Sequence, residues 1–340
     1  MTRKKVSPRV FASAALLAIL LAARPARSLP AGLDPLPPSI ETLYDAGLYS
    51  RAAEALQDAV ERNPTDASLY YWLGRCFYEI RDFSRAISSF ERVVALAPDR
   101  SEYHDWLGRA NGRKADEDSH SNMAGALSMA RRTDHEFEAA VRLNPKNIDA
   151  QRDLIAFMAS APTNLGGGEE RAREQIQSLS AEDPVEGELA LADLCAVHKK
   201  FDQANEECQR VLGGVPDRID AYFEVADYYR DREDAEHIEQ AVEAAGKIAP
   251  PDRRLLYYRG VALVLEKRDA AVAEKDLRTY IDTVPDNSEV PAHSSAYEWL
   301  GKLYESEGQP DLAAQQFKAG LVLDPQNKSL RQALKRLQKR

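Results

Sequence analysis

The sequence predicts an all-α protein, a right-handed solenoid of about eight helix-turn-helix repeats with a C-terminal capping helix. One skeleton occurs twice with the same spacing: Tyr70, Leu73, Gly74, Phe77, Ala86, Phe90 and Pro98, then Tyr297, Leu300, Gly301, Tyr304, Ala313, Phe317 and Pro325. The chain also contains a series of prolines that lie 32 to 47 residues apart: Pro64, Pro98, Pro145, Pro184, Pro216, Pro250, Pro285 and Pro325. Because one helical hairpin of this type takes about 34 residues, each proline is expected to close one unit.

Each skeleton describes two packed helices. An aromatic residue, Leu-Gly and a second aromatic residue, three positions apart, lie on one stripe of a first helix, and Ala followed by Phe forms a stripe on a second helix. Gly74 and Ala86 are small where the two helices of the second unit cross, so the backbones can approach closely. The closing proline ends the second helix.

This pattern resembles the tetratricopeptide repeat family over about residues 33 to 325, most closely in the second and eighth units. The third and fourth units, around residues 107–137 and 149–168, are similar to uncharacterised exported bacterial members. That resemblance implies a fold and a compartment, and no activity.

Three units are longer than the others. The third has extra residues between Asn111 and Thr133 with near-helical spacing and no proline, so its hairpin is expected to project beyond its neighbours or to carry a short extra helix. The fourth contains the loop 162–168, whose glycines lack the strand and the Gly-Lys-Ser/Thr ending of a phosphate-binding loop. The eighth contains residues 286–294, which we predict to be a simple linker before a helix.

Residues 1–28 have the pattern of a signal peptide. Four basic residues precede an uncharged apolar run of 14 residues, 10–23, and small residues at Ala26 and Ser28 favour cleavage after Ser28. A membrane-spanning helix needs about 20 apolar residues, so a retained anchor is the weaker interpretation. The first cysteine, Cys76, lies too far along the chain for a lipid anchor. The predicted domains are therefore a signal peptide at 1–28, a Pro-rich linker at 29–38, the solenoid at 39–325 and a basic capping helix at 326–340.

The charge balance limits the partners. Loss of the six basic residues of the signal would change the formal net charge from −10 to −16, which argues against nucleic acid as a partner and leaves proteins or peptides. The C-terminal end reverses the sign, with six cations and no acid after Pro325: Lys328, Arg331, Lys335, Arg336, Lys339 and Arg340. These cations suit the end of a capping helix, or alternatively a contact with anionic lipid or an acidic surface of another copy.

The three cysteines do not form a disulfide framework. Cys195 and Cys208 are predicted at inward positions of the two helices of the fifth hairpin. Either they form a disulfide there, or they are buried as small apolar residues.

No catalytic, cofactor or metal site is predicted. The six histidines have no metal-ligand spacing, no Cys-x-x-Cys occurs, and the nucleophile motif Gly-x-Ser-x-Gly is missing. An exported repeat protein without a reaction centre is better explained by binding.

First helices of such repeats line the concave face, so residues at their outward positions are predicted to form a peptide-binding groove. These residues are Tyr71, Arg75, Tyr78, Asp105, Arg109, Arg152, Phe223, Asp227 and Tyr257. The three arginines beside aromatic residues suit peptide or carboxylate binding. The alternative is that the arginines form ion pairs between repeats with Asp105, Asp149 and Asp153.

The predicted function is therefore a non-enzymatic protein-interaction scaffold of the cell envelope, periplasmic or extracellular, that binds an extended peptide or a helix in its groove. The alternative is a structural, self-associating component of an envelope assembly. That component would use the convex face, the projecting third hairpin and the basic C-terminal cap. No membrane span is expected after removal of the signal.

Overall fold

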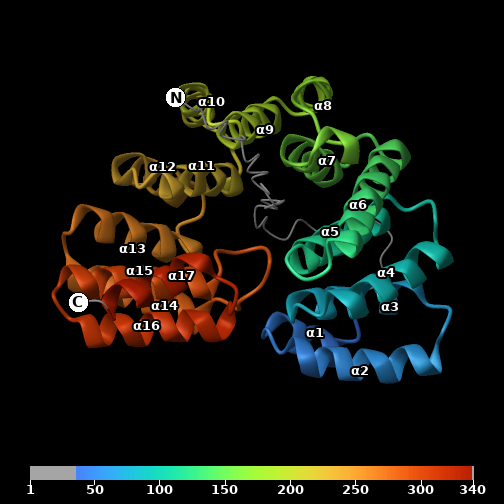
Figure 1. Ribbon diagram of the computed structural model, residues 1–340, viewed down its shortest axis with the longest axis horizontal. Helices are drawn as coiled ribbons and strands as arrows, with labels where there is room; N and C mark the ends of the chain where they lie inside the picture. The colour runs from blue at the N-terminus through green and yellow to red at the C-terminus, as the bar shows by residue number, and fades with distance from the viewer. Residues whose placement is uncertain (1–35, 339–340) are drawn as a thin grey trace, which may run out of the picture.

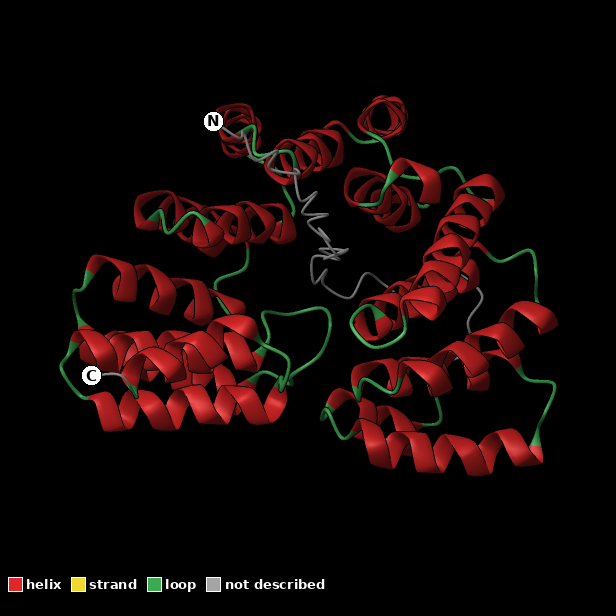
Figure 2. Cartoon of the chain, viewed as in Figure 1, coloured by secondary structure: helices red, strands yellow, loops and turns green. Residues whose placement is uncertain are grey.

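The structure is a computed structural model that describes residues 36–338, which form seventeen α-helices and one short 3-10 turn, without strands (Figures 1 and 2). The first sixteen helices pair into eight antiparallel hairpins, each made of helices that contact each other. The pairs are α1 (Pro38–Asp45) and α2 (Tyr49–Arg62), α3 (Ala67–Glu79) and α4 (Phe83–Leu96), α5 (Ser101–Asp118) and α6 (Met123–Leu143), α7 (Ile148–Ser160) and α8 (Glu169–Glu182), α9 (Pro184–Val197) and α10 (Phe201–Gly214), α11 (Ile219–Asp231) and α12 (Ala235–Ile248), α13 (Arg254–Glu266) and α14 (Ala270–Thr283), and α15 (His293–Ser306) and α16 (Pro310–Leu323). Helix α17 (Lys328–Leu337) covers the last hairpin, so the predicted fold class is confirmed.

The prolines mark the ends of the second helices. Every even-numbered helix from α2 to α16 ends two residues before one of the eight prolines of the series. Pro184 differs from the others because it is also the first residue of α9, a position where its missing N–H costs nothing. Asp and Asn side chains cap the first helices of several units; Asp66, for example, accepts hydrogen bonds from the backbone N–H groups of Ser68 and Leu69.

In the second, third and eighth hairpins a glycine of the first helix faces a ring of the second helix. A Cβ added at Gly74 would lie 2.7 Å from Phe90, and one added at Gly108 would lie 2.6 Å from Phe137. The three rings at these crossings, including that of Phe317 beside Gly301, are fully buried. The glycines are thus required for the close approach of the two helices in a unit.

The third hairpin is longer because both of its helices are longer. Helix α5 has 18 residues and α6 has 21, whereas most other helices have 13 or 14. The added turns do not all stand free, since Ala115 and Ala130 pack against Leu165 of the 3-10 turn Thr163–Leu165 in the fourth unit. Met123 and Leu127, near the start of α6, remain exposed.

The chain curves so far that its two ends meet. In the middle of the curve the first helices α7, α9 and α11 lie on the inner side and the second helices α8, α10 and α12 lie outside, and the first two units come to lie beside the last two (Figure 1). The loop between α14 and α15 makes the contact: Glu289 pairs with Arg75, and Ser288 pairs with Glu79. Residues 286–291 are therefore more than the simple linker that the sequence suggested.

The signal-peptide prediction for residues 1–28 and most of the linker at 29–38 lie outside the described residues. Between residues 36 and 338, no helix combines the length and the apolar character needed to cross a membrane.

All three cysteines are buried free thiols. Of the two alternatives for Cys195 and Cys208, the structure therefore has the second: they are buried small residues without a disulfide between them. Burial raises the pKa of the Cys76 thiol to about 12 and also raises the pKa of the other two thiols. Slow reaction of the native protein with a thiol reagent is expected, because the thiolate is the reactive form. Three thiols per chain should react in denaturant; a count of one would mean that Cys195 and Cys208 are joined.

His104 gives the third hairpin a pH dependence. Its Nδ1 lies 2.6 Å from a Glu136 carboxylate oxygen across α5 and α6, and this hydrogen bond raises the pKa of His104 against the opposing effect of burial. Because the pKa of His104 is higher in the folded than in the unfolded chain, the protonated histidine stabilises the fold at pH values below the unfolded pKa of about 6.5. This contribution is lost as the pH rises through the pKa of His104 in the folded protein. His104→Gln should therefore lower the free energy of unfolding by about 1–2 kcal/mol at pH 6 and by less at pH 9.

The measurement is urea unfolding at both pH values, with His135→Gln as the control. The His135 side chain is 73% exposed and also faces Glu136, at 3.2 Å, so its loss should change little at either pH. An equal cost of His104→Gln at pH 6 and pH 9 would contradict the linkage.

Candidate peptide-binding groove

The nine predicted groove residues all lie on first helices of their units. Tyr71, Arg75 and Tyr78 are on α3, Asp105 and Arg109 on α5, Arg152 on α7, Phe223 and Asp227 on α11, and Tyr257 on α13. The structure brings them together in two clusters, with Arg152 between the clusters. Seven of the nine are buried, and only Arg109 and Asp227 are partly accessible.

The first cluster is built around Trp106 of α5. The guanidinium carbon of Arg75 lies 3.8 Å from the centre of a Trp106 ring, and that of Arg109 lies 4.7 Å from it. Tyr78 meets the same indole edge-on at 5.4 Å. Two cations and an aromatic residue from adjacent units thus share one indole, an arrangement that fixes both guanidinium groups.

Arg109 is neutralised within the solenoid. Its Nε lies 3.1 Å from Asp105 and 2.5 Å from Asp153, which is on α7. Burial, and next the neighbouring Asp153 charge, raise the pKa of Asp105, although Arg109 opposes the rise. Arg109 therefore matches the alternative of ion pairs between repeats.

Arg75 has a different environment, which we call the Arg75 cage: the rings of Tyr44, Tyr71, Trp72 and Trp106. Their centres lie 3.8 to 6.0 Å from its guanidinium carbon. Arg75 donates to the Tyr71 hydroxyl at 3.3 Å and to Glu289 at 2.6 Å. Its only carboxylate partner among the described residues comes from the far end of the sequence, and not from the predicted Asp105.

Arg152 connects three units. It donates to Glu186 of α9 at 3.0 Å, to Asp193 of α9 at 2.7 Å and to Glu224 of α11 at 2.8 Å. Burial opposes ionisation, but the Glu224, Asp193 and Glu186 carboxylates raise the pKa of Arg152 above its usual value. Its side chain is only 5% exposed and both of its terminal nitrogens already donate to carboxylates, so it belongs to the interior of the solenoid.

The second cluster lies on α11 and α13. Phe223 stacks on Tyr258 at 5.1 Å, and Asp227 accepts a hydrogen bond from the Tyr258 hydroxyl at 3.0 Å. Tyr257 and Ser295 hydroxyl oxygens lie 2.7 Å apart, which joins α13 to α15. Burial raises the pKa of Asp227, while Arg230 counteracts this effect. These contacts connect neighbouring repeats.

The groove prediction missed the residues that organise the first cluster. Trp72, Trp106 and Trp299 each directly precede Leu-Gly and are each followed three positions later by a cation: Arg75, Arg109 and Lys302. Each cation lies over the ring of that tryptophan, at 5.9, 4.7 and 3.8 Å respectively. The repeated Trp-Leu-Gly-Arg/Lys could have been found in the sequence. Glu289 lies in an irregular loop and gave no such signal.

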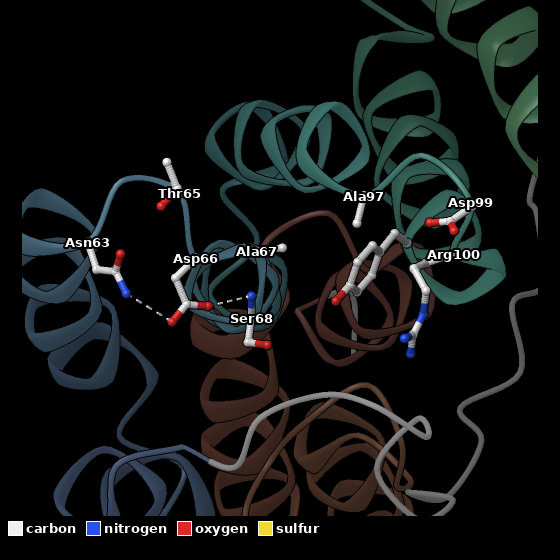
Figure 3. A pocket seen from close by; sticks show the side chains of 9 residues that line it. Asn63, Thr65, Asp66, Ala67, Ser68, Ala97, Asp99 and Arg100 are labelled. Carbon is white, nitrogen blue, oxygen red and sulfur yellow. Dashed lines mark hydrogen bonds between the residues drawn. The ribbon is translucent and has the colours of Figure 1, made fainter.

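A shallow polar hollow of about 530 Å³ lies at the turns between the first three units (Figure 3). Its walls include Asn63, Asp66, Asp99 and Tyr103. Asp66 is occupied in capping α3 and also accepts a hydrogen bond from Asn63, as the dashed lines show. The hollow is thus lined by residues of the turns between units, whose polar groups cap helices.

In the described part of the chain, no three His, Cys, Asp or Glu side chains are placed to hold a metal ion. The arginines of the predicted groove already pair with carboxylates of the same chain, as the ion pairs above show. Guanidinium groups held beside aromatic rings can bind carboxylates and pack on aromatic side chains. In this structure these contacts position the helices of neighbouring repeats.

Comparison with known proteins identifies the repeats. A profile of the tetratricopeptide repeat family matches residues 40–111 and 263–328. No curated protein matches the sequence significantly. The solved structure of yeast Tom70 is similar with a TM-score of 0.58 and 15% identity, over 92% of this chain and 66% of that chain. A tetratricopeptide repeat protein from Parabacteroides merdae has a TM-score of 0.48 at 16% identity, over 84% and 99% of the two chains. A thermophilic TPR protein of Thermus thermophilus has a TM-score of 0.45 at 20% identity, over 56% and 95%.

Proposed function

The chain is a tetratricopeptide repeat protein, a fold that serves as a protein-interaction scaffold, and we propose that it binds an extended peptide or helix of a partner along its concave face without catalysing a reaction. One observation carries the proposal. The first helix of the second unit, α3, already holds an irregular segment from elsewhere in the chain, residues 288 and 289, through both side-chain and backbone contacts. A surface that accepts one extended segment in this way is suited to others.

Photo-crosslinking in the producing cells tests the use of the concave face. A photoreactive amino acid replaces Glu102 of α5 or Lys302 of α15, whose side chains are 25% and 32% exposed on first helices. Arg85 of α4 and Arg278 of α14, 57% and 44% exposed on second helices, are the matched controls. The proposal expects a partner to be captured from the first-helix positions. Capture from the control positions alone would refute it.

The proposed compartment is outside the cytoplasm. The pattern of residues 1–28 supports export, with a cut after Ser28. Sequencing the N-terminus of the protein purified from its cells tests this, since Leu29 should come first. Export would place the acidic solenoid in the envelope or the medium.

Self-association through the convex face, the third hairpin and the cap remains the second candidate. The feature that favours it is the exposed apolar start of α6, where Met123 is 49% and Leu127 is 38% exposed. In the basic C-terminal cap, Arg336 forms an ion pair with Glu305 of α15 in the same chain, so this cation already has an acidic partner. Sedimentation equilibrium over a wide concentration range decides, because a constant monomer mass would exclude this role.

A further inference from the structure

We infer that the loop 286–291 is an internal ligand of the Arg75 cage, and that the partner of the groove is an extended peptide that replaces this loop and presents a glutamate to Arg75. The inference rests on the proposed function, because it specifies which peptide the concave face takes. It also implies autoinhibition, because the loop 286–291 covers the Arg75 cage until a peptide displaces it.

The contact resembles peptide recognition in its use of backbone and side chain together. Glu79 accepts one hydrogen bond from the Ser288 backbone N–H at 2.8 Å and one from the Ser288 hydroxyl at 2.7 Å. Arg75 donates to the Glu289 carboxylate at 2.6 Å, with the two side chains 10% and 18% exposed. Main-chain hydrogen bonds supply affinity in such contacts, and the side-chain pocket supplies specificity.

The cage fixes its arginine before any ligand arrives. Four rings surround the guanidinium group, and the Tyr71 hydroxyl takes one of its N–H groups. Burial opposes the charge, but the neighbouring Tyr44, Tyr71 and Glu289 groups keep the pKa of Arg75 well above its ordinary value. A guanidinium held in this way loses little freedom when a carboxylate binds, so the site is preorganised for one.

The cage also has donors that the loop does not use. Among the described residues, neither the Trp72 indole N–H nor the Arg75 Nε has a hydrogen-bond partner, although both are buried. A peptide with one more acceptor could satisfy them and so bind better than the loop. This difference would allow an external ligand to displace a segment of the same chain.

The closure itself is small and mostly polar. Besides the Arg75 and Glu79 contacts, Pro285 lies against Gly47, where an added Cβ would be 3.2 Å from the proline Cβ. Arg81 and Asp324 approach to 3.9 Å, with side chains 47% and 26% exposed. No member of the loop 286–291 belongs to the buried core, so its release from α3 uncovers no core side chain of the loop itself. Tyr280 of α14 donates to the Pro291 carbonyl and holds that end of the loop to its own unit.

Peptide binding in trans tests the inference on the full mature chain. The probe is a peptide with the sequence of residues 287–292, labelled with fluorescein at its N-terminus and amidated at its C-terminus, so that its glutamate is the only acidic residue it offers to Arg75. The opened variant carries Ser288→Ala and Glu289→Gln, which change the loop and leave the cage untouched. Fluorescence anisotropy is expected to show a Kd at least about ten times lower for the opened variant than for the wild type.

Three controls assign the site. A peptide with Gln in place of the glutamate should bind the opened variant at least about ten times more weakly. Arg75→Gln added to the opened variant should abolish binding of the original peptide, with circular dichroism as the check that it folds. Glu79→Gln added to the opened variant should also weaken binding of the original peptide, and it serves as the test if Arg75→Gln does not fold. Equal binding to wild type and opened variant, no binding to either, or indifference to the Gln exchange would each overturn the inference. Those results would leave the crosslinking test of the proposed function unaffected.

Discussion

Arg152→Ala is expected to lower the free energy of unfolding by about 3 kcal/mol. The arginine lies at the centre of carboxylates from two following units, Glu186, Asp193 and Glu224, and the first of these is only 5% exposed. Removing the cation leaves buried carboxylates without their main partner, which costs more than the ion pairs themselves contribute. Glu186 retains Arg218 at 3.0 Å, so the expected loss is at the lower end for a buried pair.

The measurement is urea unfolding followed by circular dichroism, with Arg210→Ala as the matched control. Arg210 also pairs with a glutamate, Glu207, but its side chain is 54% exposed. Its removal should cost less than about 1 kcal/mol. If the two variants lost equal stability, the interior ion pairs would not hold the units together.

Gly301→Ala is expected to cost about 2–3 kcal/mol, although alanine is the better helix former. A Cβ at this position would lie 2.1 Å from the ring of Phe317, which is fully buried between α15 and α16. The ring has no space to retreat, because the last hairpin and α17 enclose it in one apolar cluster. The two helices must therefore separate, and their shared contacts weaken.

Gly213→Ala provides the control. Gly213 lies in α10, and nothing lies within 4 Å of an added Cβ. Alanine there should raise the free energy of unfolding by about 0.5–1 kcal/mol, because it restricts the unfolded chain. Thermal unfolding of both variants should shift in opposite directions. A stabilising Gly301→Ala would contradict the close packing at the repeat crossing.

The sequence by itself determined the repeat and its limits. Helical periodicity, the Leu-Gly and Ala-Phe positions, and the proline series depend on contacts within one hairpin, where residues are close in sequence. Because the repeat pattern depends on residues close in sequence, it was also sufficient to place each predicted groove residue on the first helix of its unit. It also explains why the extra length of the third unit could be assigned to its two helices or to the turn between them.

Only the tertiary structure decided how the charged residues are used. Whether Arg75 meets Asp105 or Glu289 depends on the summed rotation of eight hairpins, and a small change per repeat accumulates along the chain. No local pattern records that sum, so the meeting of residues separated by 214 positions could not be read from spacing. For the same reason, the loop 286–291 looked like a linker in the sequence and closes the solenoid in space.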